Sequence, residues 1–419
     1  MSTPNNKRYW SGLDDLHQTE AFQRLHAQEF PQHESVDEAL SNDKLTSANT
    51  NRRDFLKFMG FSLAAATLAA CETPVIKSIP YTNKPEDVTP GVANFYASTF
   101  YNGYDYCNVF VKTREGRPIF INSNRKTGVG HANARVNSSV LGLYDSARLS
   151  GPRLKGKDAS WKDLDQYVVS GLKGPGRKVL LTNTVLSPSM KRTIEHFCQF
   201  NGAEHITVDA ISHGALRDAA KRHSGKDVFP SYEFKAATMV VSVGADFLGT
   251  WGDSSYYEDE WVQTRLPELK TMSRLRVFES VMSLTGTNSD YRTMVKPSEQ
   301  GKVLAAMHDL LSKGSQNQFP AGPVATAIEN AVFDLKKAGR TSLVVSGVND
   351  VDAQLLVADI NRLLGGEGTT VKYDSNQLFQ GDDRAFSALV KDMNQGKVGA
   401  LVMLDVNPAY NAVDKEAFR

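Results

Sequence analysis

Cysteine is scarce in this chain, and so are runs of like charge. Only three cysteines occur among 419 residues, Cys71, Cys107 and Cys198, and no two of them have the close spacing of a zinc or redox motif. The 48 basic and 47 acidic residues leave a formal net charge of +1, and neither sign is gathered into a long block. Because nucleic-acid binding needs a basic surface, we expect no nucleic acid as partner.

Long hydrophobic runs are missing as well. The best candidate, residues 58–70, has about 13 residues, whereas a membrane-spanning helix needs about 20. Gly60, Ser62 and Thr67 make this run still less apolar. The segment therefore does not qualify as a transmembrane helix, and its length is typical of the apolar part of a targeting signal.

Two features at the ends of this run indicate export. The residues before it resemble a twin-arginine signal, formed by Arg52, Arg53, Phe55 and Leu56. The run closes on Leu-Ala-Ala-Cys, which resembles a lipobox in which the sulfur of Cys71 receives a diacylglycerol. A buried alanine-rich helix would also fit the run alone, but the combination favours export. We predict a protein exported by the twin-arginine route and lipid-anchored through Cys71 on the periplasmic face of the cytoplasmic membrane.

About fifty residues stand before the arginine pair, where such a signal usually begins close to the first methionine. Two explanations remain open: a start codon assigned too early, or an extended signal whose helix is bound in the cytoplasm before export. We divide this part into a cytoplasmic extension of the signal (1–50), the signal with its lipobox (51–70) and a lipidated tether (71–93). Four prolines between residues 74 and 90 favour an extended tether.

Strand-like and helix-like runs follow in two regions. Residues 94–160 form a β-rich N-terminal region with a predicted hairpin of strands 107–112 and 119–122. Residues 161–419 alternate between the two kinds of run, which is typical of an α/β fold with parallel sheets. The predicted strands are 179–182, 206–209, 238–243, 342–346 and 400–404, and the predicted helices are 189–201 and 216–223. The chain stops soon after the last strand, so we expect this sequence to be the front part of a longer protein.

In this order, the segments resemble the molybdopterin oxidoreductase family from about Cys107 to the end. The landmarks are the hairpin, residues 144–149, 151–156 and 160–164, and the loops 243–246 and 405–408. With the export signal and residues 283–288 and 296–298, the chain resembles more closely the large iron-sulfur subunit of alternative complex III, a bacterial quinol-oxidising respiratory assembly. The resemblance implies a molybdopterin oxidoreductase-like α/β fold and a complex with cytochrome and integral-membrane subunits.

The ligands of an iron-sulfur cluster are missing. A [4Fe-4S] cluster needs four thiolates, and Cys107 is the only cysteine near the hairpin; residues 131–137, where the resemblance would place the fourth ligand, have none. We expect no cofactor in this chain, and iron-sulfur clusters only in a C-terminal continuation. With Cys71 lipidated, an oxidising compartment would permit one disulfide between Cys107 and Cys198, which the spacing cannot decide.

Molybdenum and other metals have weaker candidates. In the resembled family the protein ligand of molybdenum is usually Ser, Cys or Asp, and Ser187, Ser189, Asp209 and Ser212 lie in suitable loops. Ser and Asp are common in such loops in any case. The histidines at 196, 205, 213 and 223 lack metal-site spacing, so we predict surface or hydrogen-bonded core histidines. Hydrolase and phosphate-binding loop motifs are absent.

We therefore predict a cofactor-free scaffold part of a membrane-associated quinol:electron-acceptor oxidoreductase that is not catalytic by itself. Two alternatives remain open. The chain could be a molybdopterin-dependent catalytic subunit whose electron exit has been remodelled, or a stand-alone lipoprotein that binds a small ligand in the pterin cleft.

Overall fold

The computed structural model describes residues 20, 23, 88–89, 91–127, 129–374 and 378–418. The chain divides into two units, Met1–Thr82 and Asn83–Arg419, and the description below concerns the second. The predicted signal and lipid-attachment residues lie outside the described residues: Arg52, Arg53, Phe55, Leu56 and Cys71. Export, lipidation and the divisions before residue 88 therefore stay predictions.

The described part begins with a small antiparallel sheet in the order β1 (Ala93–Tyr101), β2 (Tyr106–Arg114) and β3 (Arg117–Ser123). The predicted hairpin is β2–β3, and its tight turn places Glu115 and Gly116 at φ 50° and 75°. The sequence pattern does not predict strand β1, because the middle of the strand is exposed and shows no apolar alternation.

Short elements connect this sheet to the parallel region. They are η1 (Arg125–Thr127), α5 (Ala134–Ser138), η2 (Ser139–Tyr144), β4 (Arg153–Leu154), β5 (Lys157–Asp158) and α6 (Trp161–Lys173). Side chains of β2, β3, α5 and η2 form a small core of Cys107, Val109, Ile121, Val136 and Val140. Helix α6 begins at Ser160, whose side chain caps the helix by accepting a hydrogen bond from the amide of Asp163.

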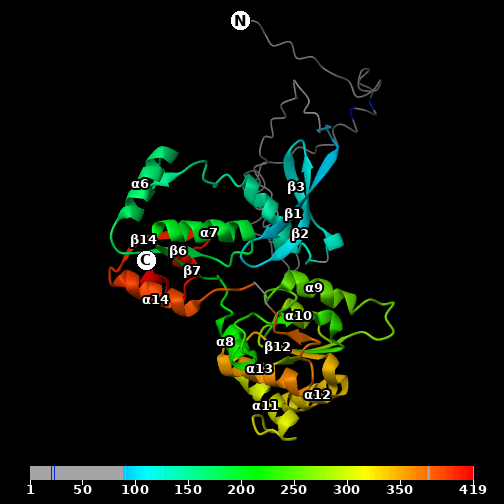
Figure 1. Ribbon diagram of the computed structural model, residues 1–419. Helices are drawn as coiled ribbons and strands as arrows, with labels where there is room; N and C mark the ends of the chain where they lie inside the picture. The colour runs from blue at the N-terminus through cyan, green and yellow to red at the C-terminus, as the bar shows by residue number, and fades with distance from the viewer. Residues whose placement is uncertain are drawn as a thin grey trace, which may run out of the picture. The chain divides into compact units, whose positions relative to one another are not determined.

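The first parallel sheet has the order β14-β6-β7. Strands β6 (Arg177–Thr182) and β7 (Ala203–Thr207) are joined by α7 (Pro188–Asn201), whereas β14 (Val398–Leu404) comes far later and follows α14 (Asp383–Asn394). The register from Val398↔Arg177 to Leu404↔Thr182 places these distant segments side by side (Figure 1). Two short helices, α15 (Pro408–Asn411) and α16 (Lys415–Phe418), follow β14.

A second parallel sheet is inserted between β7 and β14, in the order β11-β10-β9-β12. Its strands are β9 (Met239–Val243), β10 (Arg274–Glu279), β11 (Tyr291–Met294) and β12 (Ser342–Ser346). The insertion also contains a two-stranded antiparallel ribbon, in which β8 (Ser231–Tyr232) pairs with β13 (Val371–Lys372). The other elements of the insertion are α8 (Gly214–Ser224), η3 (Phe234–Ala236), α9 (Ser254–Gln263), α10 (Leu284–Thr287), η4 (Pro297–Glu299), α11 (Gln300–Ser312), α12 (Pro323–Ala338), η5 (Gly339–Thr341) and α13 (Val351–Leu363).

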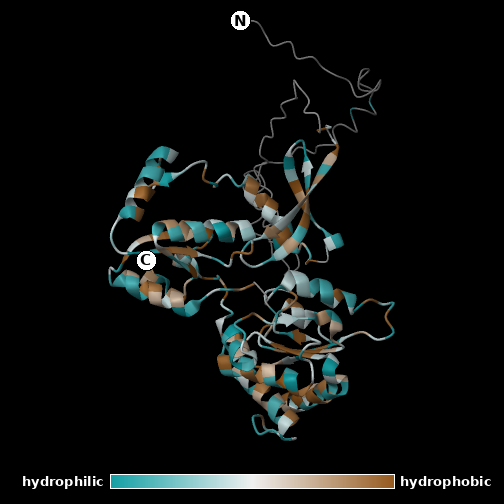
Figure 2. Cartoon of the chain, viewed as in Figure 1, coloured by the Kyte–Doolittle hydropathy of each residue, from teal (hydrophilic) through white to brown (hydrophobic). Residues whose placement is uncertain are grey.

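The second sheet has a separate apolar core on each face. Val240 and Leu343 contribute to an aromatic-rich cluster, whereas their neighbours Val241 and Val344 contribute to a cluster with α11, α12 and α13. Successive side chains of a strand point to opposite faces, so the alternation assigns the clusters to the two faces. Strands β9 and β12 are buried throughout and appear brown in Figure 2.

The predicted α/β class with parallel sheets and a small antiparallel region is confirmed, and each predicted strand and helix overlaps an observed one. Strand β10 is not predicted, because two arginines alternate with its apolar residues; Arg276 donates to Asp334 on α12 at 2.6 Å. Among the described residues, no helix combines the length and the apolar character that crossing a bilayer requires.

Candidate functional site

A cleft lies at the carboxyl ends of the first parallel sheet. Its larger hollow, about 750 Å³, is lined by residues 183–188 after β6, by Asp405 after β14, by Tyr101 of β1 and Tyr106 of β2, and by Asn102 in the turn between these strands. A second hollow of about 220 Å³ shares Asn102 and Asp405 with it. The carboxyl ends of parallel strands are where open α/β sheets bind ligands, so this cleft is the candidate binding site.

Two aspartates shape the cleft. Asp405 has a left-handed φ of 54°, a conformation that few residues besides glycine, asparagine and aspartate adopt. Asp209 accepts hydrogen bonds from the amide and hydroxyl of Thr184, both at 2.8 Å, and from the amide of Gly381 at 2.9 Å. Asp209 therefore joins the loops after β6 and β7 to the segment before α14.

The structure does not bring the four candidate molybdenum ligands together. Ser187 caps α7 and lies 3.0 Å from Ser189 between the hydroxyl oxygens. Ser212 donates to Asp383 and accepts from Asn349 at 3.2 Å, outside the cleft lining. With Asp209 joining three loops, each candidate serves the local fold. Ser189 and Ser212 line neither hollow of the cleft and do not fit as ligands of a metal bound there, whereas Ser187 and Asp209 line it.

Cys107 does not fit an iron-sulfur cluster either. Its side chain is 0% exposed and packs with Val109 and Val136. Burial, with the nearby charges of Asp105 and Asp253, raises the pKa of the Cys107 thiol to about 12. Metals bind the thiolate, so a neutral thiol is a poor ligand. Cys107 and Cys198 are both free, so the disulfide that the sequence left open is not formed.

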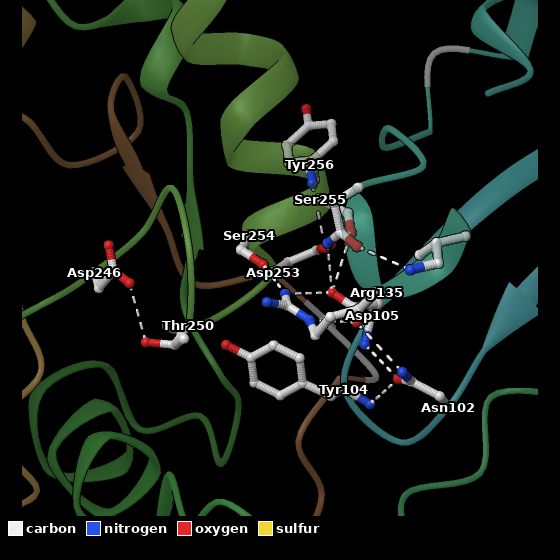
Figure 3. A network of polar contacts seen from close by, with 12 residues as sticks. Asn102, Tyr104, Asp105, Arg135, Asp246, Thr250, Asp253, Ser254, Ser255 and Tyr256 are labelled. Carbon is white, nitrogen blue, oxygen red and sulfur yellow. Dashed lines mark hydrogen bonds and ion pairs between the residues drawn. The ribbon is translucent and has the colours of Figure 1, made fainter. Parts of the chain in front are cut away.

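The charge of Asp105 acts on this thiol, and Asp105 forms an ion pair with Arg135 that is drawn in Figure 3. Asp105 in the β1–β2 turn is 0% exposed in its side chain. It accepts hydrogen bonds from Arg135 Nε at 2.8 Å and Nη2 at 2.6 Å, and from Asn133 at 2.8 Å. Arg135 Nη2 also donates to Ser254 Oγ at 3.0 Å. The network thus ties the β1–β2 turn and α5 to the start of α9.

The electrostatics of this pair favour the charged forms. Burial raises the pKa of Asp105, but the hydrogen bonds from Arg135 and Asn133 outweigh it and hold the pKa below its usual value. The Arg135 guanidinium lies 5.1 Å from the centre of the Tyr104 ring, and Tyr104 lines the smaller hollow of the cleft. Residues 131–137 stand out in the sequence only because they contain no cysteine, and nothing in the sequence indicates that Arg135 pairs with Asp105.

A second buried carboxyl, Asp253, caps α9 by accepting a hydrogen bond from the amide of Tyr256. It is 9% exposed. Burial raises the pKa of Asp253 to about 7, the Tyr256 amide lowers it in part, and the charge of Asp105 raises it further. Asp253 therefore holds a proton across the mildly acidic range, where an exposed aspartate is ionised.

We expect Asp253 to make stability fall as the pH rises. Its folded-state pKa lies above the unfolded value near 3.9, so its contribution is complete below pH 4 and is lost as the pH passes 7. Asp253→Asn keeps the cap and stays neutral, so it gains about 4 kcal/mol of unfolding free energy over wild type between pH 4 and pH 8. Urea unfolding at both pH values measures this difference.

Asp350→Asn is the matched control. Asp350 caps α13 by accepting from the amide of Ala353 at 2.9 Å but is exposed, so its replacement gives no comparable pH-dependent gain. If the free energies of unfolding of wild type and Asp253→Asn changed with pH by the same amount, Asp253 could not have a raised pKa.

The histidines have the environments expected for core or surface residues. His205 Nε2 lies 2.9 Å from the hydroxyl of Thr182, His223 pairs with Glu367, and His196 is exposed on α7. The ring of His213 packs against Phe379, 4.4 Å between centres, and burial lowers its pKa to about 4. The prediction of hydrogen-bonded or surface histidines is confirmed for His196, His205 and His223, whereas the buried Nε2 of His213 has no hydrogen-bond partner among the described residues.

Two loop landmarks meet at the second sheet. Asp246, at the end of the segment 243–246, accepts from the amide and hydroxyl of Thr285 at 2.9 and 2.8 Å. Thr285 belongs to the segment 283–288, where Ser283 caps α10. These two segments are therefore hydrogen-bonded to each other and do not line the cleft. The third landmark loop, residues 405–408, does line the cleft.

Comparisons with known proteins add little. No family model matches this sequence, and no curated protein matches it. Among solved structures, the chain is similar to one in the formyltransferase/hydrolase complex from Methylorubrum extorquens in complex with methylofuran, with 12% identity and a TM-score of 0.35. The match covers 60% of this chain and 59% of that chain, less than two thirds of its length. A similarity of this size indicates no function.

Proposed function

We propose that this chain is a cofactor-free, molybdopterin oxidoreductase-like scaffold in a membrane-associated quinol:electron-acceptor oxidoreductase similar to alternative complex III. In this proposal electrons pass through other parts of the assembly. The observation that carries the proposal is the region of Cys107, where the resembled family binds its first cluster. A neutral, buried thiol and a hydrogen-bonded ion pair occupy this region.

The ion pair suits a structural role. Asp105 accepts five hydrogen bonds, from Arg135 twice and from Asn133, Asn102 and Ser255. A buried carboxylate with so many donors is held in one position, because moving it would leave a charge without partners. The region thus serves as a rigid joint between β2, α5 and α9, in keeping with a scaffold.

An exposed apolar surface supports docking to other subunits. We define the β11 patch as Val281, Met282, Leu284 and Met294, of which Val281, Met282 and Met294 are 80, 66 and 71% exposed. The register Glu279↔Met294 places the two segments side by side at the edge of the second sheet. Exposed apolar patches are typical of protein contacts. Cytochrome and integral-membrane subunits are the proposed partners, with the lipid on Cys71 holding the chain at the bilayer.

Blue-native electrophoresis of solubilised membranes tests this role. We expect the wild-type protein to migrate in a haem-containing band, and Met282→Asp to lower the fraction in that band by about tenfold, because a charge would be buried in the contact. Phe333→Asp on α12 is the control, since Phe333 is 68% exposed but outside the patch. Migration of the wild-type protein apart from haem would contradict the scaffold role.

The cleft supports a second candidate function, that of a stand-alone lipoprotein that binds a small ligand at the carboxyl ends of β6, β7 and β14. That protein would migrate alone. The remaining alternative, a molybdopterin-dependent catalytic subunit, would require stoichiometric molybdenum in the purified full-length protein, and elemental analysis would detect it.

A further inference from the structure

A tyrosine-lined cavity adjoins the start of α9. It encloses about 420 Å³, and its lining includes Tyr106, Tyr232, Tyr256, Tyr257, Asp253 and Glu233. The tyrosines come from β2, β8 and the first turn of α9, so three separate segments of the chain build the cavity. Tyr232 and Tyr257 are buried, which fixes their positions, whereas Tyr106 and Tyr256 are half-buried.

The surroundings of this cavity are acidic. Glu260 accepts a hydrogen bond from the Tyr256 hydroxyl at 2.9 Å, and Lys372 pairs with Glu233 at 3.0 Å. Two carboxyl groups, Asp253 and Glu233, thus line the cavity, and Glu260 lies beside the Tyr256 hydroxyl. Burial, the hydrogen bond to Glu260 and the charges of these carboxylates raise the pKa of Tyr256, so its hydroxyl stays protonated. An anionic ligand would be repelled here.

One carboxyl oxygen of Asp253 accepts no hydrogen bond from the described residues. Among the described residues its side chain has one hydrogen bond, from the Tyr256 amide to Oδ1 at 3.4 Å, and none to Oδ2. This oxygen is not one of the buried side-chain atoms that lack a partner, so it keeps access to solvent and can receive a donor or a cation in the cavity that Asp253 lines. Among the described residues no group of three or more Asp, Glu, His or Cys side chains is placed to hold a metal ion, so calcium or magnesium, which takes six or more oxygen ligands, fits this cavity poorly.

We propose that this cavity binds a small organic ammonium ion. Aromatic rings attract such cations through their negative faces, and a carboxylate beside them supplies the counter-charge. Above pH 7, where Asp253 has lost its proton, its carboxylate pairs with the cation and the tyrosine rings surround the alkyl groups of the cation, so binding is measured at pH 8. The proposal concerns a site separate from the scaffold role and stands whether or not that role holds.

Isothermal titration of the purified full chain tests the proposal, with choline as the probe and 3,3-dimethyl-1-butanol as its uncharged isostere. We expect choline to bind at least about tenfold more tightly than the isostere, because only choline pairs with Asp253. Asp253→Asn should lower choline affinity by about tenfold and leave binding of the isostere unchanged. The unfolding experiments above show whether this variant is folded.

A second pair of variants examines the rings. Tyr106→Phe keeps the ring and should bind choline as wild type does, whereas Tyr106→Leu should bind several-fold more weakly. Equal affinity for choline and the isostere, no choline binding to folded wild type, or unchanged choline binding by folded Asp253→Asn would each overturn the proposal. If Asp253→Asn does not fold, equal choline affinities of Tyr106→Phe and Tyr106→Leu would overturn it.

Discussion

Replacing Arg135 by alanine should lower the free energy of unfolding by about 3 kcal/mol, because Asp105 would remain buried without its counter-charge. The Asp105 side chain is 0% exposed and receives two of its five hydrogen bonds from Arg135. Asn133, Asn102 and Ser255 would remain as donors, so we place the loss at the lower end for a broken buried pair. Urea unfolding of wild type and variant at pH 7 measures it.

An exposed ion pair provides the control for Arg135. Arg153 and Asp158 pair at 3.1 Å on the surface, and Arg153→Ala should change the free energy of unfolding by less than about 0.5 kcal/mol. Asp105→Ala should cost less than Arg135→Ala, since the half-exposed Arg135 can then reach water. Equal losses for Arg135→Ala and Arg153→Ala would show that the buried network adds no stability.

Phe229→Ala should lower the free energy of unfolding by about 4 kcal/mol, since it removes a buried ring from a packed cluster and leaves a cavity. Phe229 is 0% exposed. Its ring centre lies 4.9 Å from that of Phe379, 5.1 Å from that of His213 and 6.3 Å from that of Trp251. Because Phe379 lines the cleft, the cluster also supports one wall of the candidate site.

Phe200→Ala on α7 is the matched control for this change. Phe200 is exposed, so removing its ring should alter the free energy of unfolding by less than about 0.5 kcal/mol. The urea concentrations at the unfolding midpoints of the two variants give the difference in the free energy of unfolding, provided that this free energy falls with urea at the same slope in both. A loss below about 1 kcal/mol in Phe229→Ala would mean that the cluster closes around the missing ring.

The candidate site was predictable only in outline. Asp209 and residues 405–408 stood out because they follow apolar runs, and they do lie at the carboxyl ends of neighbouring strands. The roles of Asp105, Arg135 and Asp253 could not be predicted, because each depends on residues from a different part of the chain. Asp253 and Asp105 are far apart in sequence, yet the charge of one raises the pKa of the other.

The sequence by itself determined the elements whose signal is local. Strands β9 and β12 are short continuous apolar runs, and the hairpin β2–β3 has its turn residues at Glu115 and Gly116, so neighbouring residues suffice to specify each one. Tertiary structure decided the pairing of β14 with β6, the burial of Asp105 with Arg135 and the acidic cavity beside α9. These depend on free energies of burial and charge between distant segments, which exist only once the chain has folded.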